Sequence, residues 1–379
     1  MGNFWERLMA QGSGSGLTKV AVLGCGKVGR LVCHLLADSG DYAVTAVDAH
    51  LSQAKKVSHS SAGRSVPNVT AKACDLGNAR ELAEVLKGHD YALSCAPFHL
   101  NLEIARVCKE VGVNYLDLTE DVQTTKGVRE LAEGSKLAFI PQCGLAPGFI
   151  TIAAHNLAVE FDKVDEIKMR VGALPMYPHN ALKYNLTWST EGLINEYGNP
   201  CEAVVDGKLN LVAPLEGYER FSLDGIEYEA FNTSGGLGSL AETYDGKVRN
   251  LNYRSVRYPG HRDIIALLMN DLQLNYDRDL LRKIFEKSLP HTHQDVVLIM
   301  VTVSGWKNGL LSQKSYCKKI YNAPIRDEHW GAIQITTAAG ITAVLDIHRQ
   351  GKLPKSGFVR QEDVSFKDFL ANRFGQYYA

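Results

Sequence analysis

The chain lacks several features that would place it outside the ordinary globular class. Its 379 residues include 41 Lys and Arg against 42 Asp and Glu, so the formal net charge is only −1. That balance excludes the basic surface expected of a nucleic-acid or anionic-membrane binder. No apolar run reaches the roughly 18 residues that a bilayer-spanning helix needs. With 45% hydrophobic and 22% charged residues, the composition also argues against a disordered, collagen-like or coiled-coil chain.

The cysteines and histidines show no metal-binding pattern. The eight cysteines are scattered and form no Cys-x-x-Cys pair. We expect no disulfide framework in a chain this long without an export signal, and we therefore expect a cytoplasmic protein. His291 and His293 flank a single threonine, but no third ligand of matching spacing accompanies them, so no metal is predicted. Residues 1–16 end in alternating Gly and Ser and are interpreted as a flexible linker.

The length favours two domains, because one hydrophobic core rarely serves so long a chain. Between residues 17 and 148, short β-prone runs alternate with stretches of helical spacing. The expected strands are 19–23, 43–47, 69–73, 91–94, 115–118 and 138–141, and the expected helices are 28–37, 79–86, 102–110 and 127–133. Mostly apolar strands that alternate with helices predict a Rossmann-type, doubly wound α/β domain with a parallel sheet.

A different pattern begins after residue 148. One more helix is expected at 149–159, followed by longer β-prone runs that include 296–304 and 313–321. Asp206-Gly207 and Asp224-Gly225 each stand between such runs, and Asp-Gly is a strong hairpin signal. Residues 149–331 are therefore predicted to form an α+β domain built on an antiparallel sheet. The apolar stretch 332–349 predicts a long helix, and we expect residues 332–379 to return to the first domain.

The strongest local signal is a glycine-rich turn between a strand and a helix. Gly24, Gly26 and Gly29 form a Gly-x-Gly-x-x-Gly pattern that follows residues 20–23 and contains Lys27 and Val28. In dinucleotide-binding folds the first glycine allows a tight turn, the second admits a pyrophosphate, and the third lets helix and strand pack closely. The amides at the helix start then bind the phosphates. The sequence therefore predicts a dinucleotide cofactor.

Acidic and small residues at the ends of later strands refine this prediction. Asp48 ends the second strand, where a carboxylate accepts hydrogen bonds from the adenosine ribose and repels a 2′-phosphate, and no arginine follows it directly. We therefore predict NAD, with NADP less favoured. Asp75 is expected beside the adenine, with a helix N-cap as the alternative. Cys95, Ala96 and Pro97 follow the fourth strand, where the nicotinamide ribose would lie; a plain turn is the alternative.

Five further segments, taken in order, resemble the saccharopine dehydrogenase-like family. They are Tyr115-Leu116-Asp117-Leu118-Thr119-Glu120, Cys143-Gly144-Leu145-Ala146-Pro147-Gly148, Asn185-Leu186-Thr187-Trp188-Ser189, Arg257-Tyr258-Pro259-Gly260-His261 and Gly357-Phe358-Val359-Arg360-Gln361-Glu362. The resemblance covers nearly all of residues 18–378. One departure is that Thr190 and Glu191 stand where several relatives have Pro-Arg, whose arginine can hold a second substrate carboxylate. That departure favours a smaller basic amino acid over saccharopine.

The resemblance implies NAD-dependent oxidation of a C–N bond in an amino acid. The leading expectation is oxidation of the ε-amine of L-lysine to 2-aminoadipate 6-semialdehyde. The alternatives are an L-glutamate-forming saccharopine dehydrogenase, a carboxynorspermidine-type dehydrogenase and a dinucleotide-binding sensor without turnover. The family also implies a homodimer, with a small amino acid as the partner.

The chemistry needs a group that accepts the proton of an ammonium and a group that holds a carboxylate. Asp117, at the carboxyl end of a parallel strand, is the first catalytic candidate, with a structural carboxylate as the alternative. Glu120 and His261 are further candidates; each is equally explained as a helix-start residue. Arg257 is the expected carboxylate clamp, with a structural ion pair as the alternative. The remaining expected wall residues are Cys143, Tyr184 and Trp188.

Overall fold

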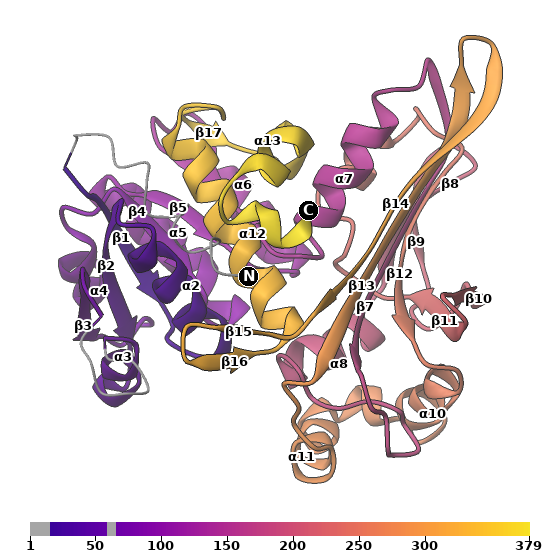
Figure 1. Cartoon of the computed structure of the whole chain (residues 1–379), viewed down its shortest axis with the longest axis horizontal. Helices are drawn as coiled ribbons and strands as arrows, with labels where there is room; N and C mark the ends of the chain where they lie inside the picture. Colours follow the sequence, from indigo (N-terminus) through magenta and orange to yellow (C-terminus); the bar gives the residue numbers. More distant parts are fainter. Residues whose placement is uncertain (1–15, 59–65) are drawn as a thin grey trace. The chain divides into compact units, whose positions relative to one another are not determined.

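The computed structural model describes residues 16–58 and 66–379 and divides into two compact units (Figure 1). Unit 1 runs up to Leu145 and also contains Ile325–Glu328 and Gln334–Ala379. Unit 2 comprises Ala146–Pro324 and His329–Ile333. Residues 1–15 of the linker prediction lie outside the described residues. The C-terminal segment thus clusters with unit 1.

Unit 1 is built on a seven-stranded sheet in the order β17-β6-β5-β4-β1-β2-β3. Every neighbouring pair in it is parallel, which confirms the predicted Rossmann-type sheet. The apolar strands are buried because helices cover the sheet. The strands are β1 (Thr18–Leu23), β2 (Tyr42–Asp48), β3 (Val69–Ala73), β4 (Tyr91–Ser94), β5 (Asn114–Asp117), β6 (Ala138–Ile140) and β17 (Gly357–Phe358).

The helices of unit 1 agree with the expected ones except at their ends. Asp121 accepts a hydrogen bond from the amide of Thr124, so the helix predicted at 127–133 begins earlier, at Val122. Two helices were not expected, α3 (Leu51–Val57) and α13 (Phe366–Ala371). The others are α2 (Lys27–Asp38), α4 (Ala79–Leu86), α5 (Asn101–Val111), α6 (Val122–Ala132) and α12 (Ala332–Arg349), joined by the short 3₁₀ turns at Phe98–Leu100, Gln361–Asp363 and Gly375–Tyr378.

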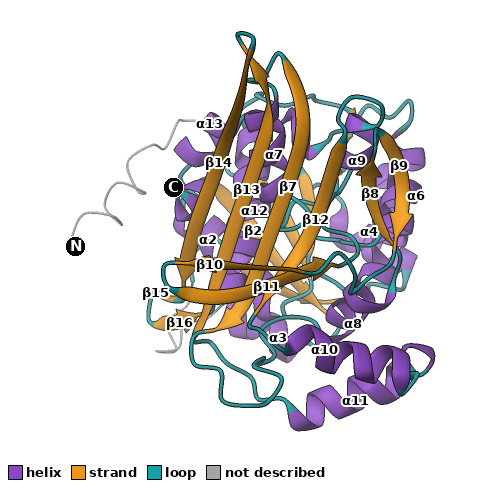
Figure 2. Cartoon of the chain, turned by 90° about the vertical axis from the view of Figure 1, so that its right-hand side faces the viewer, coloured by secondary structure: helices purple, strands orange, loops and turns teal. Residues whose placement is uncertain are grey.

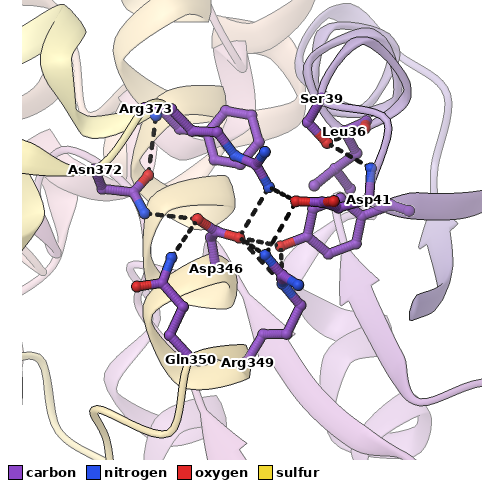
Figure 3. A network of polar contacts seen from close by, with 10 residues as sticks. Leu36, Ser39, Asp41, Asp346, Arg349, Gln350, Asn372 and Arg373 are labelled. Atoms are coloured by element: carbon purple, nitrogen blue, oxygen red, sulfur yellow. Dashed lines mark hydrogen bonds and ion pairs between the residues drawn. The ribbon is translucent and has the colours of Figure 1, made fainter. Parts of the chain in front are cut away.

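A buried carboxylate joins the C-terminal segment to the first half of unit 1. Asp346, on α12, is 1% exposed and accepts a hydrogen bond of 2.6 Å from the hydroxyl of Tyr42 on β2. It also accepts bonds from Arg349, Gln350, Asn372 and Arg373 (Figure 3). Burial alone would raise the pKa of Asp346, but Arg373, Tyr42 and Arg349 outweigh it and hold the pKa below its usual value. We call this set the Asp346 network.

Unit 2 is built on an eight-stranded sheet that is mixed, where a purely antiparallel sheet was expected. Strands β7 (Lys163–Pro175) and β12 (Asn250–Arg257) are neighbours and run parallel, while β13 (Asp295–Lys307) flanks β7 in the antiparallel sense. The parallel pair arises because the chain between β7 and β12 crosses over through helices and hairpins. The other strands are β8 (Cys201–Val205), β9 (Lys208–Val212), β10 (Glu219–Leu223), β11 (Ile226–Asn232) and β14 (Leu310–Tyr321), with β15 (Ala323–Ile325) and β16 (Glu328–Trp330) in a separate ribbon.

Both predicted hairpins are confirmed. Asp206 and Gly207 have φ of 48° and 83°, and Asp224 and Gly225 have φ of 54° and 75°. Two consecutive positive φ angles define the type I′ turn that matches the strand twist. The first turn joins β8 to β9 and the second joins β10 to β11.

The sheet of unit 2 is seen face-on in Figure 2, with β14, β13, β7 and β12 side by side and α7 behind them. Strands β10 and β11 cross its lower end, where Tyr228 packs with Leu174 and Leu298.

Among the described residues, no helix is long and apolar enough to cross a membrane. The helices of unit 2 are α7 (Phe149–Ala158), α8 (Thr190–Gly198), α9 (Leu240–Tyr244), α10 (His261–Ala266) and α11 (Arg278–Ser288), with the π turn at Leu267–Asp271 and the 3₁₀ turn at Leu274–Tyr276.

Candidate active site

The glycine-rich turn lies between β1 and α2, as predicted, and two of its glycines are required by the fold itself. Gly24 has φ of +95°, and a Cβ there would lie 2.8 Å from the carbonyl oxygen of Cys95. A Cβ on Gly29 would lie 1.8 Å from the carbonyl oxygen of Gly24. Larger residues at either position would therefore collide with backbone. These two positions need glycine whether or not a ligand binds.

Gly26 needs a different explanation. It has φ of −75°, which any residue adopts, and a Cβ there would meet no heavy atom within 4 Å. Lys27, which is exposed, and half-buried Val28 follow it as the first residues of α2. No side chain caps the first turn of this helix. A side chain at Gly26 would meet no heavy atom, and the amides at a helix start favour a phosphate.

Asp48 ends β2 and is tied to this turn. One carboxylate oxygen accepts a hydrogen bond of 2.9 Å from the amide of Cys25, and the other accepts one of 2.9 Å from the amide of His50. Asp48 is half-buried, so part of its surface remains accessible. Since a carboxylate has about four acceptor positions, it can still accept hydrogen bonds from ribose hydroxyls.

The other predicted cofactor residues lie at the same carboxyl edge of the sheet. Asp75 is exposed two residues beyond β3, and its carboxylate accepts from the amide of Gly77 at 2.9 Å. The cap of α4 is Asn78, so the alternative of Asp75 as a helix cap is wrong. Cys95 and Ala96 are half-buried and Pro97 is exposed, directly after β4. Open α/β sheets bind their ligands at this edge.

Asp117 ends β5 but is wholly buried, at 0% exposure. One oxygen accepts from the amides of Thr119 and Gln142, each at 2.9 Å, and the other accepts from the hydroxyl of Tyr115 at 2.8 Å. Burial raises the pKa of Asp117 to about 6, and these three donors oppose the rise. In this arrangement Asp117 fixes the turn that begins at Gln142.

Cys143 follows in that turn and is also fully buried. Its thiol donates to the carbonyl of Ile140 at 3.0 Å, and its sulfur accepts from the side-chain amide of Gln361 at 3.3 Å. Burial raises the pKa of the Cys143 thiol well above its usual range, so the thiolate is disfavoured. The thiol thus acts as a packing group. Gln361 comes from the 357–362 motif, which places that motif beside Cys143.

Glu120 is half-buried, one residue before the Asp121 cap of α6. Unlike Asp117, it is partly accessible. The structure therefore separates the two acids of the 115–120 motif, with one buried in hydrogen bonds and the other closer to solvent.

The predicted substrate residues of unit 2 meet in one cluster. Arg257, at the end of β12, is 3% exposed, and its guanidinium lies over the rings of Tyr184, at 5.1 Å, and Tyr197, at 5.7 Å. Trp188 donates to the hydroxyl of Tyr184 at 3.2 Å. The guanidinium donates from Nε to the hydroxyl of Tyr197 at 2.9 Å and from Nη1 to the carbonyl of Val256 at 2.9 Å.

His261 is fixed as a neutral ring within this cluster. Its Nδ1 lies 2.8 Å from the carbonyl oxygen of Leu182, which can only accept, so Nδ1 carries the proton. Its Nε2 therefore accepts from the hydroxyl of Tyr197, at 2.9 Å. Burial and the charge of Arg257 lower the pKa of His261 to about 3. Both ring nitrogens are thus engaged, and the geometry suits a positioning role better than the predicted proton-transfer role.

Sequence reasoning missed two members of this cluster. Tyr197 joins Arg257 to His261, and Glu196 lies with Oε2 3.9 Å from Nη2 of Arg257. Both lie on α8, which was not among the expected helices. The available signal was the N-cap Ser189, which accepts from the amide of Gly192 and stands just before Thr190 and Glu191.

No group of three or more potential metal ligands occurs among the residues that the structure describes.

Comparison with known proteins identifies the family to which the chain belongs. Residues 20–138 match the saccharopine dehydrogenase NADP binding domain, and residues 144–374 match the saccharopine dehydrogenase C-terminal domain. The mitochondrial alpha-aminoadipic semialdehyde synthase of Mus musculus is 25% identical over 228 residues, which are 55% of this chain and 24% of that protein. The synthase of Arabidopsis thaliana is 23% identical over 218 residues, 54% of this chain and 20% of that protein. The chain thus spans about a quarter of the length of these curated relatives.

A solved structure agrees with the fold. Apo saccharopine dehydrogenase (L-Glu forming) from Saccharomyces cerevisiae has a TM-score of 0.76 and 15% sequence identity, with 93% of this chain and 95% of that chain covered. Fold and glycine turn together define a dinucleotide-binding protein with a second, mixed-sheet unit. The two domain matches, which span most of its length, are more specific: the chain belongs to the saccharopine dehydrogenase family.

Proposed function

We propose that the protein catalyses the NAD-dependent oxidative deamination of an amino acid, with the ε-amine of L-lysine as the leading substrate. The observation that carries the proposal is Gly26, whose missing side chain serves no contact within the protein and leaves the start of α2 open. When bound, NAD supplies the acceptor for the hydride that leaves the carbon beside the amine. Asp48 supports NAD over NADP, because a 2′-phosphate would meet its negative charge.

Arg257 supports an amino-acid substrate. A guanidinium held between two tyrosine rings is a rigid fork for a carboxylate. We assign Tyr184 and Trp188 to the same substrate site. In unit 1, we propose Cys143 as a wall residue, since its protonated thiol offers no nucleophile.

The amine must be neutral before it can lose a hydride, so one group must accept its proton. Asp117 and His261 already hold all of their polar atoms in hydrogen bonds. We propose that each has a positioning role within its own unit, and that Glu120, which is half-buried, is the leading group for proton transfer. The pKa of about 6 would let Asp117 change its charge near neutral pH if one of its donors were released.

The second candidate is oxidation of saccharopine with release of L-glutamate, which the names of the relatives favour. The two substrates differ by a second carboxylate-bearing arm. Glu191, which stands where several relatives have an arginine, is exposed at the start of α8 and would repel that arm. This charge supports L-lysine.

The test is a panel of L-lysine, saccharopine, ornithine and carboxynorspermidine with NAD and with NADP, followed by the absorbance of the reduced cofactor. Turnover of L-lysine with NAD is expected. Turnover of saccharopine alone would replace the leading substrate by the second candidate, and turnover of carboxynorspermidine alone would indicate a polyamine enzyme. No turnover with any amine, together with intact NAD binding, would favour a sensor.

A further inference from the structure

Arg257 and Glu196 form an ion pair in unit 2 that differs from the pairs of Glu219 with Arg170 and Arg254. Nη2 of Arg257 and Oε2 of Glu196 are 3.9 Å apart, whereas charge-assisted hydrogen bonds span about 2.7–2.9 Å. The side chains are 4% and 10% exposed, so both charges are largely removed from water. By comparison, Arg254 donates directly to Glu219 at 2.6 Å, and Arg170 donates to the same carboxylate.

The guanidinium of Arg257 is held in one orientation, but only two of its three nitrogens donate hydrogen bonds to described residues. Nε and Nη1 are occupied by Tyr197 and Val256. Nη2 donates no hydrogen bond to any residue within 16–58 or 66–379, and the carboxylate of Glu196 is 3.9 Å from it. The rings of Tyr184 and Tyr197, with centroids 5.1 and 5.7 Å from the guanidinium carbon, and the bond to Tyr197 orient the Nη2 edge.

We propose that Arg257 and Glu196 together bind the zwitterionic head of an α-amino acid, with the carboxylate on Arg257 and the α-ammonium on Glu196. The proposal rests on the proposed function and adds Glu196 as the residue that determines specificity. A head group that carries both charges is neutral overall, as is the Arg257–Glu196 pair. Both charges can therefore be buried with a partner each.

The same pair rejects ligands that carry only one of the two charges. A carboxylate without an α-ammonium places its negative charge beside Glu196, and an amine without a carboxylate places its positive charge beside Arg257. The repulsion between like charges at such distances is stronger in a buried site than in water. The substrates selected are therefore α-amino acids with an intact head group, which leaves the side-chain amine as the one to be oxidised.

The experiment titrates L-norleucine, hexanoate and hexylamine into the full chain in the presence of NAD, by isothermal calorimetry. L-Norleucine carries the zwitterionic head without an ε-amine, so binding is measured apart from side-chain oxidation. We expect L-norleucine to bind at least about tenfold more tightly than either single-charge ligand, because each charged hydrogen bond is worth about 1.5–3 kcal/mol. Equal affinities for L-norleucine and hexanoate would overturn the proposal.

Glu196→Gln should remove most of the preference for L-norleucine over hexanoate, since it removes both the ammonium ligand and the repulsion. Glu219→Gln is the matched control, because it neutralises another arginine-paired carboxylate of unit 2 and should leave the preference unchanged. Should Glu196→Gln fail to fold, Glu196→Asp withdraws the carboxylate by one methylene and should reduce the preference. A Glu196→Gln protein with the wild-type preference would contradict the proposal.

These outcomes also separate the proposal from the proposed function. If no amine reduces NAD but the protein still binds L-norleucine more tightly than hexanoate and hexylamine, the head-group site is supported and the proposed oxidation is not. If hexylamine is oxidised as readily as L-lysine, the oxidation stands and the head-group site does not.

Discussion

The Asp346 network in unit 1 and the Arg257 cluster in unit 2 both bury arginine and a carboxylate, but they treat the charges differently. Asp346 accepts hydrogen bonds from Tyr42, two arginines, Asn372 and Gln350, all within the unit (Figure 3). In the Arg257 cluster, the guanidinium keeps 3.9 Å from Glu196 and leaves Nη2 without a hydrogen bond to a described residue.

The difference teaches where to look for ligand binding in a fold with many buried charges. Asp346 accepts hydrogen bonds directly from its arginines, and removing such a buried carboxylate leaves their charges uncompensated. Arg257 and Glu196 are 3.9 Å apart, which is longer than a charge-assisted hydrogen bond. The first arrangement predicts a structural role, and the second predicts a binding site.

The largest expected effect is on the Asp346 network. Asp346→Ala should lower the free energy of unfolding by about 3–5 kcal/mol, because it leaves buried guanidinium groups without their carboxylate. Urea denaturation measures this loss. The control is Glu84→Gln on the exposed pair with Lys87, where we expect a change within about 0.5 kcal/mol. A loss below about 1 kcal/mol for Asp346→Ala would show that the network is not structural.

The buried acid Asp117 sharpens the comparison, since its hydrogen-bond donors are the neutral groups of Tyr115, Thr119 and Gln142. Its pKa is raised from 3.8 to about 6 by burial, so the folded protein binds this proton more tightly than the unfolded chain does. Unfolding free energy should therefore fall by about 3 kcal/mol as the pH rises through that interval. Asp346, whose pKa is lowered, contributes in the opposite direction, and its contribution is lost at lower pH.

The measurement compares denaturation curves of the wild type and Asp117→Asn across that pH range. The difference between the two unfolding free energies should change with pH by about 3 kcal/mol. A difference that stays constant would mean that Asp117 ionises normally in the folded protein.

The glycine turn contains the same contrast on a smaller scale. Gly29→Ala should lower stability by about 1–3 kcal/mol, because its Cβ meets the backbone at Gly24. Gly26→Ala meets nothing within the protein, so its stability should change by less than about 0.5 kcal/mol. Its affinity for NADH should instead fall about tenfold, as fluorescence titration would measure. Equal NADH affinity in wild type and Gly26→Ala would show that the cofactor phosphate does not bind at this turn.

Asp48 combines a structural role with a ligand-binding role. It accepts two hydrogen bonds from backbone amides, and its carboxylate can still accept hydrogen bonds from a ligand. Asp48→Asn should weaken NAD binding and relax the preference for NAD over NADP by about tenfold, because the charge that repels a 2′-phosphate is gone. Steady-state KM values for both cofactors measure the preference. An unchanged ratio would mean that another residue selects the cofactor.

The sequence predicted the parts of this account that depend on local pattern. The strands of unit 1, the glycine turn and the two Asp-Gly hairpins follow from spacing and turn chemistry over a few residues. The parallel pairing of β7 with β12 within the second sheet was not predicted, because it depends on a crossover of the chain between distant segments. Tyr197 and Glu196 were missed for the same reason, since only tertiary packing places α8 beside Arg257. The full burial of Asp117 likewise has no local signal.

The most direct test of the comparison is the thermal stabilisation that L-lysine gives to three proteins: the wild type, Asp346→Asn and Arg257→Lys. Arg257→Lys keeps the positive charge but loses the fork that holds a carboxylate. Ligand that binds only the folded state raises its melting temperature. The account predicts that Asp346→Asn melts earlier but keeps the L-lysine shift, while Arg257→Lys loses it. A shift that survives in Arg257→Lys, or disappears in Asp346→Asn, would contradict it.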